Sequence, residues 1–464
     1  MTATRIETDS LGSLHLPTEV LYGIATLRGQ RNFDISQVKL GHVPELLRAL
    51  ARIKRAAAEA NRDLHVIPDK LAEAICAAAI EVEDGQHALH FVIDLLEGSG
   101  GTSINMNMNE VLANRALQIL GEAPGNYALV HPNDHVNAGQ STNDVVPSAL
   151  KLAIFEKSKD LLEALDRLAN AFRERADAFP DVLRVGRTCL QAGQPMLLSQ
   201  ALGGYAAAVR RQADKLAEIR QQLLVLPLGG TAIGTGLGAA RGYRQCVYRH
   251  LQEIVGEGVR PGDDPFDTIQ NADTFSRVSA ELRVCAEVLG KIASDLAVLA
   301  SDPAGGIGEL ILPPVQAGSS IMPGKINPVM PMMMQQVSFA VIGNDTAVSL
   351  ASLHGQLEIN HFEPIMASRI FDSLDLMARA CRIFSGQCVS GIEPDRDQSL
   401  RNLLQSPAIA TVFAQRLGYA ETSKLVKEAD QQKRPFVEFA IEKGLLTGSE
   451  VLNTLHASTQ YQEF

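Results

Sequence analysis

Residues 318–331 read GSSIMPGKINPVMP, and this stretch decides how the rest of the chain is interpreted. Its three prolines and two glycines exclude a regular helix or strand. Apolar side chains dominate, and the polar groups are two serines, one lysine and one asparagine. A restricted apolar loop with few polar groups is typical of a loop that lines a cavity and binds a small anion. The alternative is a buried connector between long helices.

Long helical segments surround this loop. Leu/Ala periodicity with charged opposite faces predicts helices at 148–178, 195–224, 274–301, 333–353 and 362–387. The first two are far longer than the ordinary mean of about 11–12 residues. Helices of this length expose apolar stripes on more than one side, which copies of the same chain cover in a symmetric bundle. We therefore expect an obligate homo-oligomer, with a tetramer as the favoured state.

The remaining segments are shorter. Residues 1–45 are punctuated by Gly and Pro and predict irregular structure, and 121–147 is rich in turn residues. Helices are expected over 44–62, from Pro68 past residue 78, over 104–120, and as several short helices after residue 397. We expect three domains: an N-terminal mixed and helical domain (1–141), a central long-helix bundle (142–396) and a small C-terminal helical domain (397–464).

Composition narrows the class of protein. The chain is 46% hydrophobic and 20% charged, which is typical of a globular protein, and its net charge of −11 argues against a nucleic-acid partner. The longest apolar runs fall short of the ~20 residues that span a bilayer, so no membrane association is expected. The N-terminus has no apolar signal core, and the six cysteines form no CxxC pair. We expect a cytoplasmic protein with free thiols and no metal ligands.

Three further segments, 98–109, 139–144 and 186–191, interrupt the helices with Gly, Ser, Thr and Asn. Hydroxyls, amides and backbone N–H groups at helix ends are good ligands for carboxylates. Each segment alone is also explained by helix capping. Together with Lys325 in the first loop, the four segments favour an anion site.

These motifs, taken in order, resemble the aspartase/fumarase superfamily over essentially the whole chain. The resemblance includes GTSINMN (101–107), NDHVN (133–137), QSTND (140–144), GRT (186–188), GTAIGTG (230–236) and GND (343–345). It implies an all-α, three-domain fold with a long central five-helix bundle. It also implies a homotetramer with a twenty-helix core, in which each active site is shared by three subunits. No cofactor is required in such enzymes, and activation by a divalent metal is left open.

The resemblance assigns roles by position for a lyase acting on a small dicarboxylate. Ser319 would be the general base, with Lys325 supporting it on the loop. Thr102, Ser141, Thr142 and Ser320 would hold the carboxylate beside the abstracted proton. Thr188, Lys325 and Asn327 would hold the other carboxylate, with Cys189 nearby and Asn143 near the leaving group. His131, Asn133 and Asp134 resemble a secondary carboxylate site, and a locally capped turn explains them equally well.

The sequence resembles the aspartate ammonia-lyase branch most, with class II fumarase second. It departs from the superfamily pattern where Cys189 and Met332 replace a histidine and its paired glutamate, and where Ala25 and Gly238 replace polar residues. The expected reaction is loss of ammonia from L-aspartate to give fumarate. The alternatives are a fumarate hydratase, a lyase for an N-substituted aspartate or succinate adduct, and a non-catalytic scaffold protein.

Overall fold

The computed structural model describes residues 3–256, 258–318, 321–322 and 324–460. The predicted base Ser319 and the predicted ligand Ser320 lie outside the described residues. The chain divides into two compact units. Unit 1 comprises Met1–Leu161, Lys215–Arg283 and Val341–Asp375, and unit 2 comprises Leu162–Asp214, Val284–Ala340 and Leu376–Phe464. The division into three domains stays a prediction.

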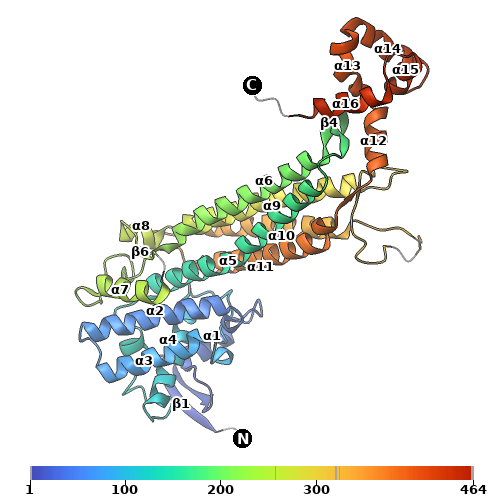
Figure 1. Cartoon of the computed structure of the whole chain (residues 1–464). Helices are drawn as coiled ribbons and strands as arrows, with labels where there is room; N and C mark the ends of the chain where they lie inside the picture. The colour runs from blue at the N-terminus through green and yellow to red at the C-terminus, as the bar shows by residue number, and fades with distance from the viewer. Residues whose placement is uncertain (1–2, 257, 319–320, 323, 461–464) are drawn as a thin grey trace. The chain divides into compact units, whose positions relative to one another are not determined.

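Five long helices dominate the chain and lie side by side (Figure 1). They are α5 (Thr142–Ala178), α6 (Leu198–Ile219), α9 (Asp273–Leu299), α10 (Val329–Leu353) and α11 (Glu363–Gln387). The 37 residues of α5 rise ~1.5 Å each, which gives a length of ~55 Å. The predicted all-α fold with five long central helices is thereby confirmed.

Several helix boundaries differ from the prediction. Helix α5 begins at Thr142, six residues early, and includes Pro147 in its second turn, where the ring removes one backbone hydrogen bond of the helix. Residues 195–197, predicted to begin a helix, instead end strand β4 (Gln191–Leu197), which pairs antiparallel with β3 (Leu183–Thr188). The helix ends at Ile219, and Arg220–Leu224 is a 3₁₀ turn, η4. Helix α10 already begins at Val329, within the stretch predicted to be irregular.

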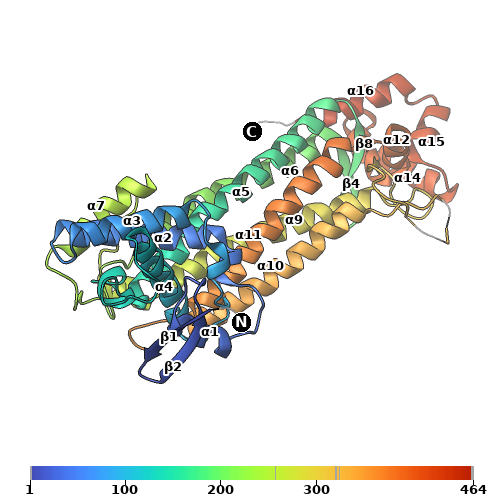
Figure 2. The ribbon, with the colours of Figure 1, turned by 90° about the horizontal axis from the view of Figure 1, so that it is seen from below.

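The expectation of irregular structure over residues 1–45 was wrong. Strands β1 (Thr4–Asp9) and β2 (Gly12–Pro17) form an antiparallel hairpin beside helix α1 (Ile24–Asn32) (Figure 2). The buried carboxylate of Glu110 accepts hydrogen bonds from the backbone N–H groups of Gly23, Ala25 and Thr26 at 2.8–3.0 Å. It thus satisfies the free donors at the start of α1, which an isolated nine-residue segment could not do for itself.

The rest of unit 1 is built around three helices whose predicted starts are confirmed within two residues. They are α2 (Pro44–Asp63), α3 (Asp69–Glu83) and α4 (Thr102–Ile119). The shorter elements are η1 (Leu40–His42), η2 (Ala88–His90), η3 (Pro132–Val136), β5 (Val225–Leu226), α7 (Tyr243–Val255), β6 (Arg260–Pro261) and α8 (Pro265–Gln270). Helix α2 carries an apolar stripe at helical spacing, with Leu46, Leu50 and Ile53 fully buried.

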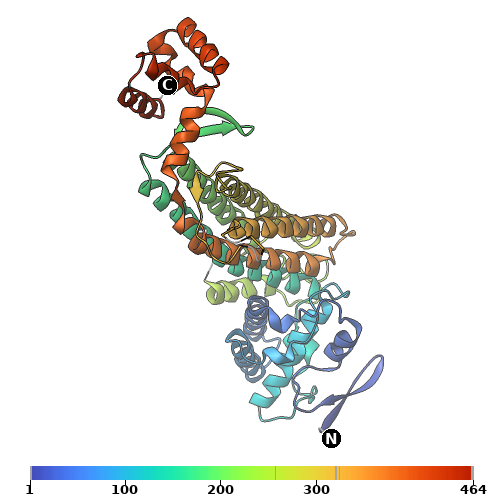
Figure 3. The same ribbon diagram turned by 90° about the vertical axis from the view of Figure 1, so that its right-hand side faces the viewer.

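The C-terminal part of unit 2 is a cluster of short helices (Figure 3). Its elements are β7 (Leu310–Ile311), η5 (Val389–Gly391), β8 (Glu393–Pro394), α12 (Arg396–Gln405), η6 (Pro407–Ile409), α13 (Ala410–Leu417), α14 (Tyr419–Gln431), α15 (Phe436–Glu442) and α16 (Gly448–Ser458). Leu403, Phe413 and Phe436 form its core together with Leu183 and Val185 of β3. The hairpin β3–β4 is therefore anchored in this core. Among the helices of the described residues, none combines the length and apolarity that a bilayer crossing requires.

A buried ion-pair cluster fixes the same hairpin from its other side. The carboxylate of Glu309, 1% exposed, accepts from Arg184 Nε at 2.9 Å and from Arg187 Nη2 at 2.6 Å. Asn402 Nδ2 of α12 donates to it at 3.1 Å. Two arginines of β3 thus depend on one buried anion.

We predict that Glu309→Gln lowers the free energy of unfolding by about 3 kcal/mol, because it leaves the buried guanidinium group of Arg184 and the half-buried one of Arg187 without an anion. The shift of the urea unfolding midpoint at constant slope measures this loss. The control is Glu393→Gln, which removes an exposed carboxylate 3.6 Å from Arg175 in the same unit and should change stability by less than about 1 kcal/mol. Equal losses in the two variants would contradict the role given to Glu309.

Candidate functional site

The starts of two helices meet in unit 1 where the sequence predicts an anion site. Gly101 precedes α4, and a Cβ there would lie 2.8 Å from Val146 Cγ1 of α5, so only glycine allows this approach. Buried Asn105, one turn into α4, donates from Nδ2 to Thr142 Oγ1 at 3.3 Å and to Asn137 Oδ1 at 3.2 Å. Thr102 and Thr142 therefore lie at adjoining helix N-termini, where the helix dipoles favour negative charge.

Asp144 holds the turn that precedes α5. Its side chain is fully buried, and it accepts three backbone N–H groups, from Ser141 at 2.9 Å, Gly229 at 3.0 Å and Thr231 at 2.9 Å. Burial raises the pKa of Asp144 to about 7, against the lowering effect of these hydrogen bonds and of Lys54. Because all three donors are fixed, Asp144 joins residues 141–144 to the glycine-rich segment 229–231.

Lys54 lies under the same turn. It belongs to α2 and is 0% exposed, and its Nζ donates to Asn137 Oδ1 at 2.8 Å and to Gln140 Oε1 at 3.0 Å. Burial lowers the pKa of Lys54 to about 7, and the charge of Asp144 opposes this shift. A buried cation and a buried anion thus hold the two ends of residues 137–144.

The other predicted residues of this turn make local contacts. Ser141 Oγ accepts from the backbone N–H of Asn143 at 3.2 Å. Asn143 Nδ2 donates to the carbonyl oxygen of Ala232 at 2.8 Å, so its amide is positioned by the segment that follows Thr231. Ser141, Thr142 and Asn143 are all half-buried, which leaves polar atoms accessible at the helix start.

The predicted secondary carboxylate site is a capped turn. His131 Nδ1 accepts the backbone N–H groups of Asn133 and Asp134, both at 3.2 Å, at the start of the short wide turn η3. The carboxylate of Asp134 is 77% exposed and lies 3.5 Å from His131 Nδ1. A role for His131, Asn133 and Asp134 in carboxylate binding stays a prediction.

In unit 2, Thr188 ends strand β3 and Cys189 stands in the turn that follows. Cys189 and Leu190 both have positive φ angles, of 52° and 60°, in the left-handed region that side chains other than glycine rarely adopt. Both residues are exposed and line a cavity with Arg184, Arg187 and other residues. The strained turn presents the Cys189 thiol away from the protein core.

The loop 318–331 closes on itself at its base. Asn327 Nδ2 donates to the carbonyl oxygen of Gly318 at 3.0 Å. A Cβ on Gly318 would lie 1.8 Å from the carbonyl oxygen of Lys325. The backbone at the two ends of the loop is therefore in such close contact that position 318 requires glycine. The side chain of Lys325 is exposed, as are the apolar side chains of Ile321, Met322 and Ile326. The described part of the loop therefore projects from a fixed base.

The predicted residues divide between the two units. Thr102, Ser141, Thr142 and Asn143 gather at the adjoining helix starts of unit 1, and Thr188, Cys189, Lys325 and Asn327 belong to unit 2. Sequence reasoning overlooked Lys54, although a signal was present. Lys54 follows Leu47 and Leu50 at the spacing of the buried stripe of α2, where an unpartnered charge would be costly.

The comparisons with known proteins assign this chain of long central helices to the lyases. A family model described as "Lyase" matches residues 12–343. The aspartate ammonia-lyase of Helicobacter pylori is 41% identical over 447 residues, with 96% of each chain covered. That of a Bacillus species is 39% identical, with 97% of each chain covered.

Solved structures give the same result. A fumarate lyase:delta crystallin from Brucella melitensis, bound to cobalt, matches with a TM-score of 0.95 and 41% identity, over 98% of this chain and 100% of that one. The class II fumarase of Schistosoma mansoni matches with a TM-score of 0.89 and 32% identity, over 98% of this chain and 99% of that one. The chain belongs to the lyase family, and the resemblance to the aspartase/fumarase superfamily is confirmed.

We predict that Lys54→Met lowers the free energy of unfolding by about 3 kcal/mol, because Asp144 loses its buried cation and two amide oxygens lose their donor. Urea unfolding measures the loss. The control is Lys70→Met on the neighbouring helix α3, where the lysine is exposed and the change should be within about 0.5 kcal/mol. A loss no larger than that of the control would mean that Lys54 does not hold the turn.

The shifted pKa of Lys54 also predicts a dependence on pH. Between about pH 7 and pH 10.5 the unfolded chain keeps a proton on this lysine that the folded protein has released. Its contribution therefore makes the free energy of unfolding rise with pH. The stability gap between wild type and Lys54→Met should widen by about 2 kcal/mol from pH 7 to pH 9. A gap that stays constant or narrows would contradict the lowered pKa.

Proposed function

We propose that this chain is a carbon–nitrogen lyase that eliminates ammonia from L-aspartate, or a related amine from a close derivative, to give fumarate. The observation that carries the proposal is the likeness to aspartate ammonia-lyases over 96–97% of the chain. The polar helix starts of unit 1 support it, because backbone N–H groups and hydroxyls there are the donors that a carboxylate needs.

In the proposed reaction, Ser319 as an alkoxide removes the proton from the carbon beside one carboxylate. The electron pair moves onto that carboxylate and forms an aci-carboxylate with almost two negative charges. It then returns to form the carbon–carbon double bond as the carbon–nitrogen bond breaks. The nitrogen keeps the electrons of that bond and leaves as ammonia, so L-aspartate gives fumarate and ammonia. The energetic difficulty is the aci-carboxylate, which preorganised donors stabilise.

The proposal assigns the donors by the superfamily resemblance. Thr102, Ser141, Thr142 and Ser320 hold the carboxylate that gains charge. Thr188, Lys325 and Asn327 hold the other carboxylate, and Asn143 lies near the amine. His131, Asn133 and Asp134 form a secondary carboxylate site. We further propose a homotetramer in which each active site combines residues from three subunits.

Water exclusion is part of this proposal. A serine hydroxyl is a poor base unless nearby N–H groups, a cation and a dry environment lower its pKa. The exposed apolar side chains of Ile321, Met322 and Ile326 suit a loop that closes over a bound substrate and excludes water. Lys325 on the same loop supplies the cation.

We propose that the enzyme turns over without a cofactor and acts in the cytoplasm. We further propose that a divalent cation activates it. The cation is suggested by the Brucella melitensis lyase whose solved structure is bound to cobalt. The cytoplasmic location is supported by the six cysteines, none of which forms a disulfide.

One feature favours a second substrate class. Cys189 and Met332, both exposed to solvent, stand where the superfamily has a histidine and its paired glutamate. The loss of this polar pair weakens the case for water as the added or released group. It favours an amine larger than ammonia, as in an N-substituted aspartate.

We predict that the purified protein forms fumarate and ammonia in equal amounts from L-aspartate. Absorbance of fumarate follows the reaction, and the reverse reaction is run with fumarate and ammonia, a panel of larger amines, or water alone. Ser319→Ala should lower kcat by about 10²–10⁴-fold, the usual contribution of a general base. The control, Ser10→Ala in the exposed β1–β2 turn, should keep full activity.

Each outcome of the panel distinguishes one function. Reaction with larger amines alone would replace aspartate by an N-substituted substrate, and reaction with water alone would make the protein a hydratase. Turnover that Ser319→Ala leaves intact would remove this residue from the base role. No consumption of fumarate under any condition would identify a non-catalytic scaffold protein.

A further inference from the structure

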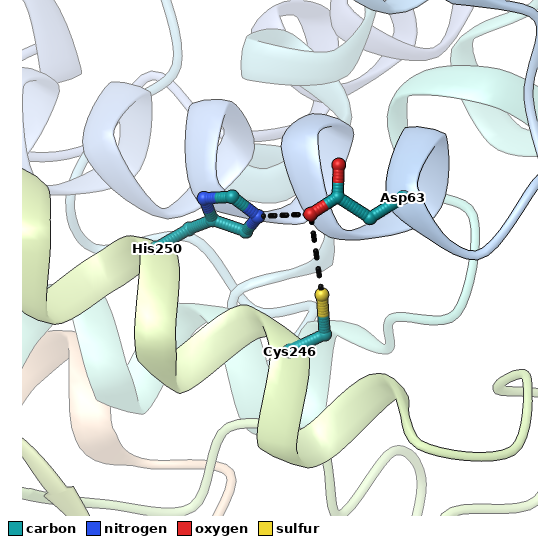
Figure 4. A group of neighbouring side chains, drawn as sticks. All are labelled: Asp63, Cys246 and His250. Carbon is teal, nitrogen blue, oxygen red and sulfur yellow. Dashed lines mark hydrogen bonds and ion pairs between the residues drawn. The ribbon is translucent and has the colours of Figure 1, made fainter.

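A second cluster of reactive side chains lies between α2 and α7 of unit 1 (Figure 4). Asp63 is the last residue of α2, and Cys246 and His250 stand four residues apart on α7, so both point from one face of that helix. His250 Nε2 lies 2.8 Å from Asp63 Oδ2, and Cys246 Sγ lies 3.8 Å from the same oxygen. One atom from each residue lies within 4.8 Å of the other two.

This set of atoms matches the preference of borderline divalent ions. Zn²⁺ takes thiolate sulfur at about 2.3 Å, imidazole nitrogen at about 2.0 Å and carboxylate oxygen at about 2.0–2.2 Å, in a tetrahedral arrangement. Such bonds place neighbouring ligand atoms about 3.3–3.6 Å apart. Against this spacing, the 3.8 Å between Cys246 Sγ and Asp63 Oδ2 is slightly long and the 2.8 Å between His250 Nε2 and Asp63 Oδ2 is short by about half an ångström. Side-chain adjustments of that size would let the three atoms surround an ion.

The surroundings of His250 also fit a ligand. Its Nδ1 lies 3.2 Å from Glu59 Oε2 and 3.6 Å from Glu253 Oε2. Metal-bound histidines usually donate their other ring N–H to a carboxylate, which fixes the tautomer and the ring orientation. Glu59 on α2 can accept that N–H, which leaves Nε2 facing Asp63 and Cys246.

A cationic group already stands among the three ligands. Arg249 Nη2 lies 2.7 Å from Asp63 Oδ2, 3.2 Å from Cys246 Sγ and 3.3 Å from His250 Nε2. The Arg249 side chain is 57% exposed, whereas Cys246 and His250 are each 8% exposed. The guanidinium can therefore turn into solvent while the ligands remain in place. Asp63, Cys246 and Arg249 also line a cavity of about 1170 Å³, which gives an ion a path of entry.

We propose that Asp63, Cys246 and His250 form a binding site for a Zn²⁺- or Co²⁺-like ion, with water in the fourth position. On binding, the Cys246 thiol gives its proton to the buffer, its sulfur bonds to the metal, and the Arg249 guanidinium leaves for solvent. The ion then joins α7 to the end of α2. The site is separate from the residues proposed to handle the dicarboxylate.

The test uses the full-length protein, freed of metal with a chelator and titrated with Co²⁺ under reducing conditions. We expect one ion per chain and the intense near-ultraviolet absorption of a thiolate–cobalt bond. Cys246→Ser should abolish that absorption and weaken binding at least tenfold. Arg249→Ala should strengthen binding, because it removes the competing cation without touching a ligand.

The matched control is Cys76→Ser, which removes another thiol of unit 1, whose Sγ donates to the carbonyl oxygen of Arg55 instead. It should bind Co²⁺ as the wild type does. Absence of stoichiometric binding in both the wild type and Arg249→Ala would overturn the site and leave the cluster as a hydrogen-bonded contact between α2 and α7. Unchanged absorption in a folded Cys246→Ser variant would also overturn it.

Discussion

The structure of the polar turn before α5 depends on two charges buried beneath it. Asp144 binds three backbone N–H groups and Lys54 binds two amide oxygens, and both groups are removed from water. Isolated, either charge would be strongly unfavourable. Together they offset each other, and the hydrogen bonds determine where residues 137–144 must lie. The hydroxyls that we assign to substrate binding therefore stand on a turn that is fixed before any ligand arrives, as electrostatic stabilisation of a transient anion requires.

The same device recurs at the other polar segments. Glu110 satisfies the start of α1, and Glu309 pairs with two arginines of the strand that ends at Thr188. In each case a buried carboxylate receives donors from a segment next to the predicted site residues: backbone N–H groups at the start of α1, and arginine side chains on β3. The helices form the apolar core, and these carboxylates fix the neighbouring segments in place through hydrogen bonds and ion pairs. The exception is the loop 318–331, whose base is closed by backbone contact and the Asn327 amide instead. A loop whose two ends are held together is suited to moving as a unit.

The sequence predicts structure well where the deciding interactions are local, and poorly where they join residues far apart in the chain. Periodicity is local, so the long helices and α2, α3 and α4 were predicted within a few residues. Residues 1–45 and 195–197 were assigned to the wrong structure because their structure depends on distant partners. The start of α1 needs Glu110, and β4 needs β3, whose core partners Phe413 and Phe436 come more than two hundred residues later. The motifs located the polar helix starts. They did not identify Lys54, whose role is visible only once α2 packs beneath the turn.

The proposed site of Asp63, Cys246 and His250 differs from the cysteine pattern that a sequence search for metal ligands uses. Metal spacing is usually sought as paired cysteines, and none exists here. Cys246 and His250 do have a ligand spacing, four residues on a helix, but the third donor comes from a helix end 183 residues away. Arg249 explains how the cluster is stable without an ion, because its guanidinium contacts all three donors. A metal and this arginine are therefore alternative cations for one anionic site. Their competition sets the affinity, so a site of this kind binds metal more weakly than its ligands alone would allow.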